Sequence, residues 1–257
     1  MIDAVVEDVR SGALHRDNIS FEGLRQSFAN ADEDVRRTLD RGRALLESPT
    51  QLDAYLYWYG RMTRLQWGAF FEHVDIPPGR LQVIDYACGQ GLACVLLFDH
   101  FGRGLVDQID RVVLIEPSAT ALRRAQAIVS CYLGRGGEIR CINKMLDGVT
   151  AEDLEMQEGR TTIHLFSNVL DIEGFDTYSL FGKMLRTRGL HHVLAVSHHR
   201  YHNGGSSRIE DLAKALTEPN NWDGDVRLRS DCAWFFLSDG KPAISWELVA
   251  EVLHDSI

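Results

Sequence analysis

The sequence lacks three features that mark particular classes of protein. No apolar run approaches the roughly 20 residues that a membrane-spanning helix needs. The opening stretch MIDAVVEDVR carries acids where a secretory signal needs a basic flank. Basic residues are in the minority, with 27 Lys and Arg against 37 Asp and Glu and a formal net charge of −10. We therefore expect a cytoplasmic protein with no membrane partner, and we disfavour binding to duplex nucleic acid, which relies on clustered Lys and Arg.

Paired cysteines and metal-ligand spacings are absent as well. Histidines gather between His191 and His202, but no acid spacing supports a metal site, and strand alternation turns neighbouring histidines to opposite faces. We predict no bound metal and no disulfide framework, with the thiols buried and reduced. The five cysteines, none of which forms a C-x-x-C pair, are Cys88, Cys94, Cys131, Cys141 and Cys232.

Hydrophobic patterning divides the chain at a segment that cannot be helical. Before it, EDVRRTLDRGRALLES and the stretch that opens at Thr50, with Asp53 as a capping-box partner, both have helical patterns. The segment DIPPGR, Asp75–Arg80, holds two prolines and a glycine, which end a helix. We predict an N-terminal helical cap over residues 1–77 and a main domain over residues 78–257.

Strand and helix patterns alternate after this boundary. LQVIDYA, RVVLIEP, EIRCINK, TTIHLFSNV and LHHVLAVSHH are apolar strand segments, and helical segments lie between them. Such alternation predicts a parallel sheet covered by helices on both faces. The last two strands, joined by the turn SDGKP, add an antiparallel edge. The expected fold class is therefore α/β, with the helical cap in front.

The first strand of the main domain runs into a glycine turn, VIDYACGQG, and then into a helix. Such a turn lets the backbone approach a ligand, and the helix N-terminus offers free N–H groups. A dinucleotide site needs a third glycine or alanine, where this chain has Cys94. Asp85 at the strand end repels pyrophosphate and suits a ligand with an ammonium group and no phosphate. A nicotinamide-dependent oxidoreductase is therefore the weaker hypothesis.

VIDYACGQG resembles the first motif of the class I S-adenosylmethionine-dependent methyltransferases, in which a strand ends in an acid and runs into G-x-G-x-G. Ala87 stands in place of the first glycine, and we expect the turn to survive unless this residue needs a positive φ. The second strand ends in Glu116, where the family has an acid that accepts from both ribose hydroxyls. The resemblance implies a Rossmann-like, mostly parallel seven-stranded sheet, S-adenosyl-L-methionine as methyl donor and S-adenosyl-L-homocysteine as product.

The resemblance is weaker in the third strand and fair in the fourth. It places Asn143 and Met145 near the adenine, where the family's usual acid is missing unless Asp147 reaches the base. HLFSNVLDI resembles the family's segment beside the sulfonium, and it is not the [DNS]-P-P-[YFW] tetrad of base-amino methyltransferases. The cofactor-binding residues that the resemblance implies are Asp85, Ala87, Cys88, Gly89, Gly91, Glu116, Pro117, Asn143, Met145, Phe166, Ser167 and Asn168.

Two further clusters are candidates for work on the methyl acceptor. In VSHHRYHNGG, His198, His199 or His202 can act as a base near neutral pH, the alternative being ordinary polar loop residues. In YLYWYGRMTRLQW, Tyr55 and Tyr59 share a helical face that either shapes the acceptor pocket or packs the cap on the sheet. The catalytic candidates are His198, His199 and Tyr59.

The sequence thus predicts a methyltransferase that acts on a small molecule or on a protein or peptide side chain. Two alternatives stay open. One is an RNA methyltransferase with a local basic patch around the cleft. The other is a methyltransferase-like binding subunit without catalysis, because Ala87 and the missing adenine acid depart from the family pattern.

Overall fold

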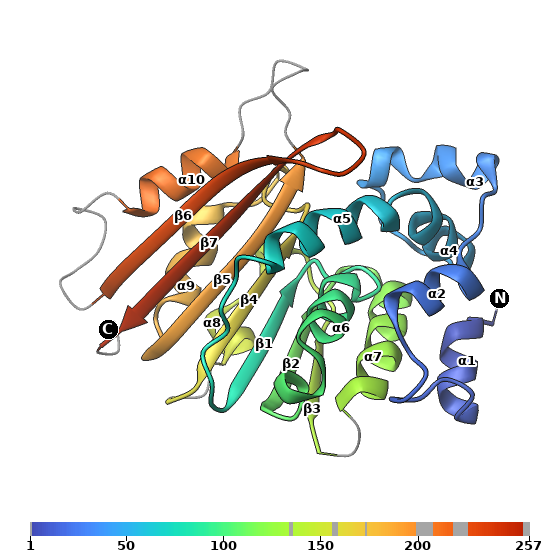
Figure 1. Cartoon of the computed structure of the whole chain (residues 1–257), viewed down its shortest axis with the longest axis horizontal. Helices are drawn as coiled ribbons and strands as arrows, with labels where there is room; N and C mark the ends of the chain where they lie inside the picture. The colour runs from blue at the N-terminus through green and yellow to red at the C-terminus, as the bar shows by residue number, and fades with distance from the viewer. Residues whose placement is uncertain are drawn as a thin grey trace.

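One mixed sheet of seven strands forms the centre of the molecule (Figure 1). The computed structural model describes residues 2–133, 136–155, 159–172, 174–198, 208–217 and 226–253. The strands are β1 Leu81–Tyr86, β2 Ile109–Ile115, β3 Glu138–Ile142, β4 Thr161–Ser167, β5 Gly189–His198, β6 Val226–Phe236 and β7 Pro242–Val252. Their order is β3-β2-β1-β4-β5-β7-β6; β1 to β5 run parallel, and β7 runs antiparallel to β5 and β6. This confirms the expected fold class.

Helices cover both faces of the sheet. They are α1 Ala4–Ser11, α2 Phe21–Phe28, α3 Glu33–Thr38, α4 Pro49–Trp58, α5 Gly60–Phe71, α6 Leu92–Val106, α7 Ala119–Leu133, α8 Ala151–Leu154, α9 Thr177–Met184 and α10 Arg208–Thr217, with 3-10 turns η1 Asp40–Gly42 and η2 Leu146–Gly148. α5, α6 and α7 pack on one face with α1 and α2, and α8, α9 and α10 pack on the other (Figure 1). No described helix is both long enough and apolar enough to cross a membrane.

The start of α4 differs from the sequence prediction. Ser48 is the N-cap: its hydroxyl accepts from the N–H of Gln51, and the Gln51 side chain returns a bond to the N-cap backbone. Pro49 follows at the first helical position, where its fixed φ suits the helix and its missing N–H is not needed. The prediction that Thr50 opens this helix was therefore wrong by two residues.

The expected helices of the cap are interrupted twice. α3 ends at Thr38, because Asp40, Arg41 and Gly42 take φ values of +41°, +56° and +89° and turn the chain back. α4 and α5 then meet at Tyr59, which ends the first helix and precedes the second. The long stretch expected as one helix from Thr50 is thus two helices with a bend between them.

The cap and the sheet share one hydrophobic core. Phe21 and Trp67 of the cap belong to the same buried cluster as Val83 of β1, Leu97 of α6 and Val112 of β2. The cap therefore lies directly on the sheet and its first two crossover helices, and the division of the chain at residues 77 and 78 stays a prediction.

The central strand β1 is buried along its whole length and serves both cores. Leu81 and Val83 face the layer of α5, α6 and α7, whereas Ile84 and Tyr86 face the layer of α8, α9 and α10. Because side chains alternate along a strand, Asp85 faces the first layer, beneath the start of α6.

A chain of buried hydrogen bonds crosses three strands on the second face. The Thr187 carbonyl can only accept, so Nε2 of His191 (2.8 Å away) carries a proton. In neutral His191, Nδ1 then accepts from Nε2–H of His164 at 3.1 Å, and Nδ1 of His164 accepts from the Tyr86 hydroxyl at 3.0 Å. Burial lowers the pKa of His191 and holds that of His164 well below its usual 6.5, which agrees with two neutral rings.

Replacing His164 with glutamine is expected to lower the free energy of unfolding by about 2 kcal/mol at about pH 7.5, because Tyr86 and His191 lose buried partners. The folded-state pKa of His164 is depressed, so the unfolded chain binds the proton first, and stability is lost as the pH falls below about 6.5. The variant lacks this titration. In urea unfolding, the difference in the free energy of unfolding between the unmodified chain and the variant should therefore be smaller by about 1 kcal/mol at about pH 5.5 than at about pH 7.5. A difference that does not change with pH would argue against a neutral His164.

Candidate functional site

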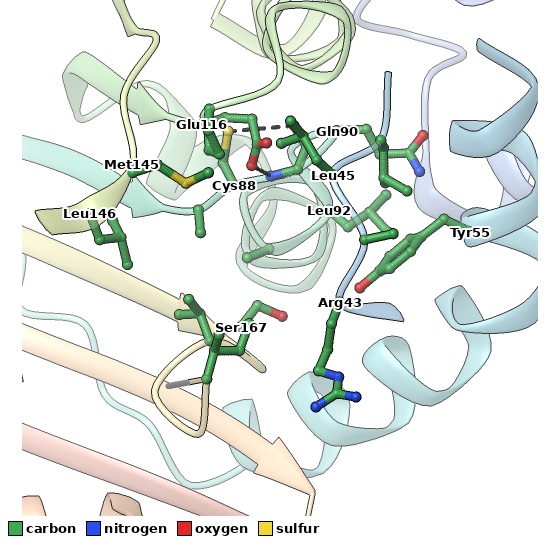
Figure 2. Close-up of a pocket in the computed structure, with 18 of the residues that line it drawn as sticks. Arg43, Leu45, Tyr55, Cys88, Gln90, Leu92, Glu116, Met145, Leu146 and Ser167 are labelled. Carbon is green, nitrogen blue, oxygen red and sulfur yellow. Dashed lines mark hydrogen bonds between the residues drawn. The ribbon is translucent and has the colours of Figure 1, made fainter. Parts of the chain in front are cut away.

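A cavity of about 530 Å³ opens at the carboxyl ends of β1 to β4, beneath the cap (Figure 2). In open parallel sheets this edge is where ligands bind. Most of its lining is apolar. The lining residues are Arg43, Ala44, Leu45, Leu46, Tyr55, Thr63, Ala87, Cys88, Gly89, Gln90, Leu92, Ala93, Glu116, Pro117, Met145, Leu146, Asp147, Ser167, Val169, Ile172, Gly174 and Phe175.

The turn between β1 and α6 uses the left-handed backbone region at all three positions of its G-x-G-x-G-like pattern. The φ values are +50° at Ala87, +54° at Gly89 and +83° at Gly91. The expectation that a positive φ at Ala87 would destroy the turn was wrong; the turn forms, with a strain of about 1 kcal/mol at this residue. A Cβ at Gly89 would meet nothing within 4 Å, whereas one at Gly91 would lie 3.2 Å from the Cβ of Ala125. Gly89 therefore keeps the backbone open to the cavity, and Gly91 lets α6 approach α7.

Asp85 lies fully buried under this turn and does not line the cavity. No described group reaches either carboxylate oxygen in good hydrogen-bond geometry. Burial raises the pKa of Asp85 to about 7; the nearby thiol and N–H of Cys94 oppose this shift, and the charge of Glu116 adds to it. A buried carboxyl without a well-formed hydrogen bond is costly to the fold, which makes Asp85 a candidate for a role beyond stability.

Glu116, at the tip of β2, lines the cavity and joins two loops. One carboxylate oxygen accepts the N–H of Gly89 and the other that of Ser118, each at 2.9 Å. Burial raises the pKa of Glu116, and these two bonds oppose the shift. Each carboxylate oxygen can accept a further bond, so Glu116 can serve two donors of a ligand in the cavity.

The turn is fixed to the cap through Gln90. Its amide donates to the Leu52 carbonyl at 2.9 Å and accepts from the guanidinium of Arg124 at 3.2 Å. Arg124, only 1% exposed, also pairs with Asp3 at 2.8 Å and with Asp53 at 2.7 Å. One buried arginine thus connects α7, the start of the chain, α4 and the glycine turn.

A second set of bonds fixes α5 to the end of β4. The Trp67 indole donates to the hydroxyl of Ser167 at 3.0 Å, and the amides of Gln66 and Asn168 exchange bonds of 3.1 and 2.9 Å. Asn168 has a φ of +57°, a conformation that asparagine tolerates. Ser167 therefore lines the cavity with its own proton still available as a donor, while Asn168 is engaged with the cap.

The structure brings most, but not all, of the sequence-predicted cofactor residues to the cavity. Asn143 instead donates to the carbonyls of Glu116 and Pro117, at 2.9 and 2.7 Å, and Phe166 stacks in the core against Tyr86. Those that line the cavity are Ala87, Cys88, Gly89, Glu116, Pro117, Met145 and Ser167. Those that do not are Asp85, Gly91, Asn143, Phe166 and Asn168.

Of the predicted catalytic residues that the structure describes, neither His198 nor Tyr59 lines the cavity. His198 ends β5, opposite Ala243 of β7, whereas His199 and His202 lie outside the described residues. Tyr59 lies beside Tyr55, with ring centroids 5.2 Å apart, and it is Tyr55 that lines the cavity. Their catalytic roles stay predictions.

Sequence reasoning missed the part of the lining that comes from residues 43–46 and from Gly174 and Phe175, whereas Val169 and Ile172 lie within the segment HLFSNVLDI that the resemblance indicates. No sequence motif places residues 43–46 at the cavity, because their position depends on the left-handed turn at η1. Gly42 is the one residue of this turn whose type favours a positive φ. Asp147, considered for the adenine end, does line the cavity next to Met145. Among the described residues, no group of His, Cys, Asp and Glu side chains is arranged to hold a metal ion.

Neither a protein-family model nor a curated protein sequence matches the chain. Solved structures do. A SAM-dependent methyltransferase from Aquifex aeolicus superposes with a TM-score of 0.50 and 10% identity, over 79% of this chain and 98% of that one. The plantazolicin methyltransferase BpumL, in complex with a pentazolic desmethylPZN analog and SAH, superposes with a TM-score of 0.50 and 11% sequence identity, over 98% of this chain and 100% of that one.

The chain has the class I methyltransferase fold. At these identities the likeness establishes the fold alone. Within this fold, the cavity lies at the glycine turn and at the acidic tip of β2, the two places where the sequence resembles the class I first and second motifs.

Proposed function

We propose that the chain is an S-adenosylmethionine-dependent methyltransferase and that the cavity binds the methyl donor. The observation that carries the proposal is the pair of buried carboxyls, Asp85 and Glu116, at the tips of adjacent strands. Buried negative charge disfavours a phosphate and favours a cation. A nucleoside with an ammonium and a sulfonium group and no phosphate meets this requirement.

The residues of the cavity fit such a donor at three points. Glu116 has acceptor capacity for both ribose hydroxyls. Met145 and Leu146 offer an apolar surface for a base, and Asp147 beside them supplies an acceptor for an adenine amino group. Gly89 leaves the backbone accessible. These residues would hold the donor between the glycine turn and the cap.

The bound donor would supply a methyl group activated by positive sulfur. The chain then has to orient the two reactants and exclude water. Ser167 and Thr63 lie in the wall of the cavity, and residues 43–46 and Tyr55 of the cap line it as well. An acceptor that is already ionised needs no general base, which agrees with the absence of a described histidine from the lining.

We propose a small molecule or a protein or peptide side chain as the methyl acceptor. Leu45, Ile172 and Phe175 add apolar surface to the lining of the cavity. Arg43 is the single basic residue among the described lining residues, and the net charge of the chain is −10, so an RNA acceptor is disfavoured.

A thermal-shift comparison tests the proposal. S-Adenosylmethionine and S-adenosylhomocysteine should raise the melting temperature, because a ligand at about 100 times its dissociation constant adds about 2.7 kcal/mol. NADH should not. Stabilisation by NADH alone would refute the proposal, and binding of the nucleosides without methyl transfer to any extract would point to a non-catalytic subunit.

Replacing Glu116 with glutamine should weaken S-adenosylhomocysteine about tenfold in calorimetric titration, because a charge-assisted hydrogen bond contributes about 1.5 kcal/mol or more. The variant keeps the side-chain shape. Glu72→Gln, at an exposed position after α5, is the matched control and should bind normally. Equal affinities for the two variants would remove Glu116 from the site.

A further inference from the structure

The end of the cavity opposite Glu116 carries two hydrogen-bond donors from the cap. Figure 2 shows Glu116 at one end and Arg43 at the other, with the hydroxyl of Tyr55 directed inward from α4. Neither residue is in the glycine turn or at a strand tip. This end therefore has chemistry that is not needed to hold a ribose or a base.

The segment that carries Arg43 is fixed in place at both ends. On one side, the left-handed turn at η1 brings Gly42 against the rings of Tyr55 and Tyr59, where an added Cβ would lie 3.5 to 3.6 Å from ring carbons. On the other side, the carbonyl of Leu46 accepts the hydroxyl of Ser118 at the start of α7. Residues 43–46, which line the cavity, are thus held in place at both ends.

The guanidinium of Arg43 has little to bind within the protein. Its one ion pair with a described residue, Asp40, has an N–O distance of 3.6 Å between side chains that are 49% and 65% exposed. Such a pair contributes little. A guanidinium presents five N–H donors in a planar fork that matches a carboxylate, so most of these donors are available to a ligand.

The hydroxyl of Tyr55 is also available. No hydrogen bond from it to a described residue is found, although the ring is packed against Tyr59. Burial raises the pKa of this phenol to about 12, so the hydroxyl keeps its proton at neutral pH and acts as a donor. Two nearby groups, Tyr59 and Glu116, raise the pKa of Tyr55 further.

We propose that Arg43 and Tyr55 form a carboxylate-binding site at the cap end of the cavity. The inference rests on the proposed function for the source of the carboxylate, which is either the amino-acid part of the methyl donor or the acceptor itself. In both cases the guanidinium supplies the charge and a fork of donors, and the phenol supplies one further donor.

The first arm of the test uses the donor product. Calorimetry compares S-adenosylhomocysteine with its decarboxylated analogue on the full chain and on Arg43→Gln. If the donor carries the carboxylate, the variant loses about tenfold in affinity for S-adenosylhomocysteine and nothing for the analogue. Arg37→Gln, an exposed charge change in α3, is the matched control and should behave as the unmodified chain.

The second arm uses phenylbutyrate and its amide, phenylbutanamide, with and without S-adenosylhomocysteine. If the acceptor carries the carboxylate, phenylbutyrate binds better than the amide, and this preference is lost in Arg43→Gln and reduced about threefold in Tyr55→Phe. An Arg43-dependent carboxylate preference in either arm supports the site. Its absence from both arms overturns it. Failure of the unmodified chain to bind S-adenosylhomocysteine would instead sink the proposed function, and the phenylbutyrate arm would still decide the carboxylate site.

Discussion

Replacing Asp85 with asparagine is expected to make the ligand-free chain more stable and a poorer binder of S-adenosylhomocysteine. Burial raises the folded-state pKa of Asp85 from 3.8 to about 7. The folded chain therefore holds a proton that the unfolded chain releases, and stability is lost as the pH rises from about 4 to about 7. Above this window the buried ionised carboxyl costs on the order of 4 kcal/mol. The variant never ionises and avoids this cost.

Urea unfolding at two pH values measures the effect. At about pH 4.5 the variant should be less stable by about 1 kcal/mol, because Asp85 is then protonated in the folded chain and the cost of the buried amide is the same at both pH values. At about pH 8 the variant should be more stable by about 2 kcal/mol, since the buried amide offsets part of the gain. Affinity for S-adenosylhomocysteine at about pH 8 should fall about tenfold, as the charge beneath the glycine turn no longer attracts the ammonium group.

A matched control is Asp99→Asn in α6. Asp99 is an exposed residue that also has a raised pKa, but its carboxylate accepts the N–H of Phe21 and the hydroxyl of Tyr132, each at 2.7 Å. The same substitution there should destabilise the chain. If Asp85→Asn also destabilises it at about pH 8, Asp85 is an ordinary structural carboxylate and its assigned role is lost.

Replacing Arg124 with methionine should lower the free energy of unfolding by about 3 kcal/mol or more. The change removes the cation from a buried network and leaves Asp3 and Asp53 without their partner, and breaking a buried pair in this way costs about 3 to 5 kcal/mol. Gln90 also loses a donor, so the glycine turn is held less firmly and affinity for S-adenosylhomocysteine should fall as well.

Arg123→Met is the comparison for this change. Arg123 is the preceding residue of α7, is exposed, and takes part in no described ion pair, so its loss should stay within about 0.5 kcal/mol. Urea denaturation of both variants distinguishes the loss of the buried network from the loss of one positive charge. Equal, small losses would show that the network does not hold the cap on the turn.

The parts of the site that could be predicted from sequence are those that local patterns determine. An apolar run followed by Gly89 and Gly91 specifies a strand, a tight turn and a helix, and an acid before the turn or at the end of β2 is placed by the strand itself. The parallel order of β1 to β5 follows from the helices between them. Asp85, Glu116 and the sheet edge were therefore accessible without a structure.

The cap side of the site was not accessible in the same way. The rings of Tyr55 and Tyr59 lie beside each other, as one helical face predicts, but only Tyr55 lines the cavity. Arg43 reaches the cavity because Asp40 and Arg41 adopt a left-handed conformation that could not be predicted from their residue types. Both outcomes are decided by packing between distant segments.

The most direct measurement of the central claim is the structure of the chain with S-adenosylhomocysteine bound. The account predicts the ribose hydroxyls on the carboxylate of Glu116, the base beside Met145, and the amino-acid part over the glycine turn above Asp85. A ligand bound elsewhere, or bound in the cavity without touching Glu116, would contradict it.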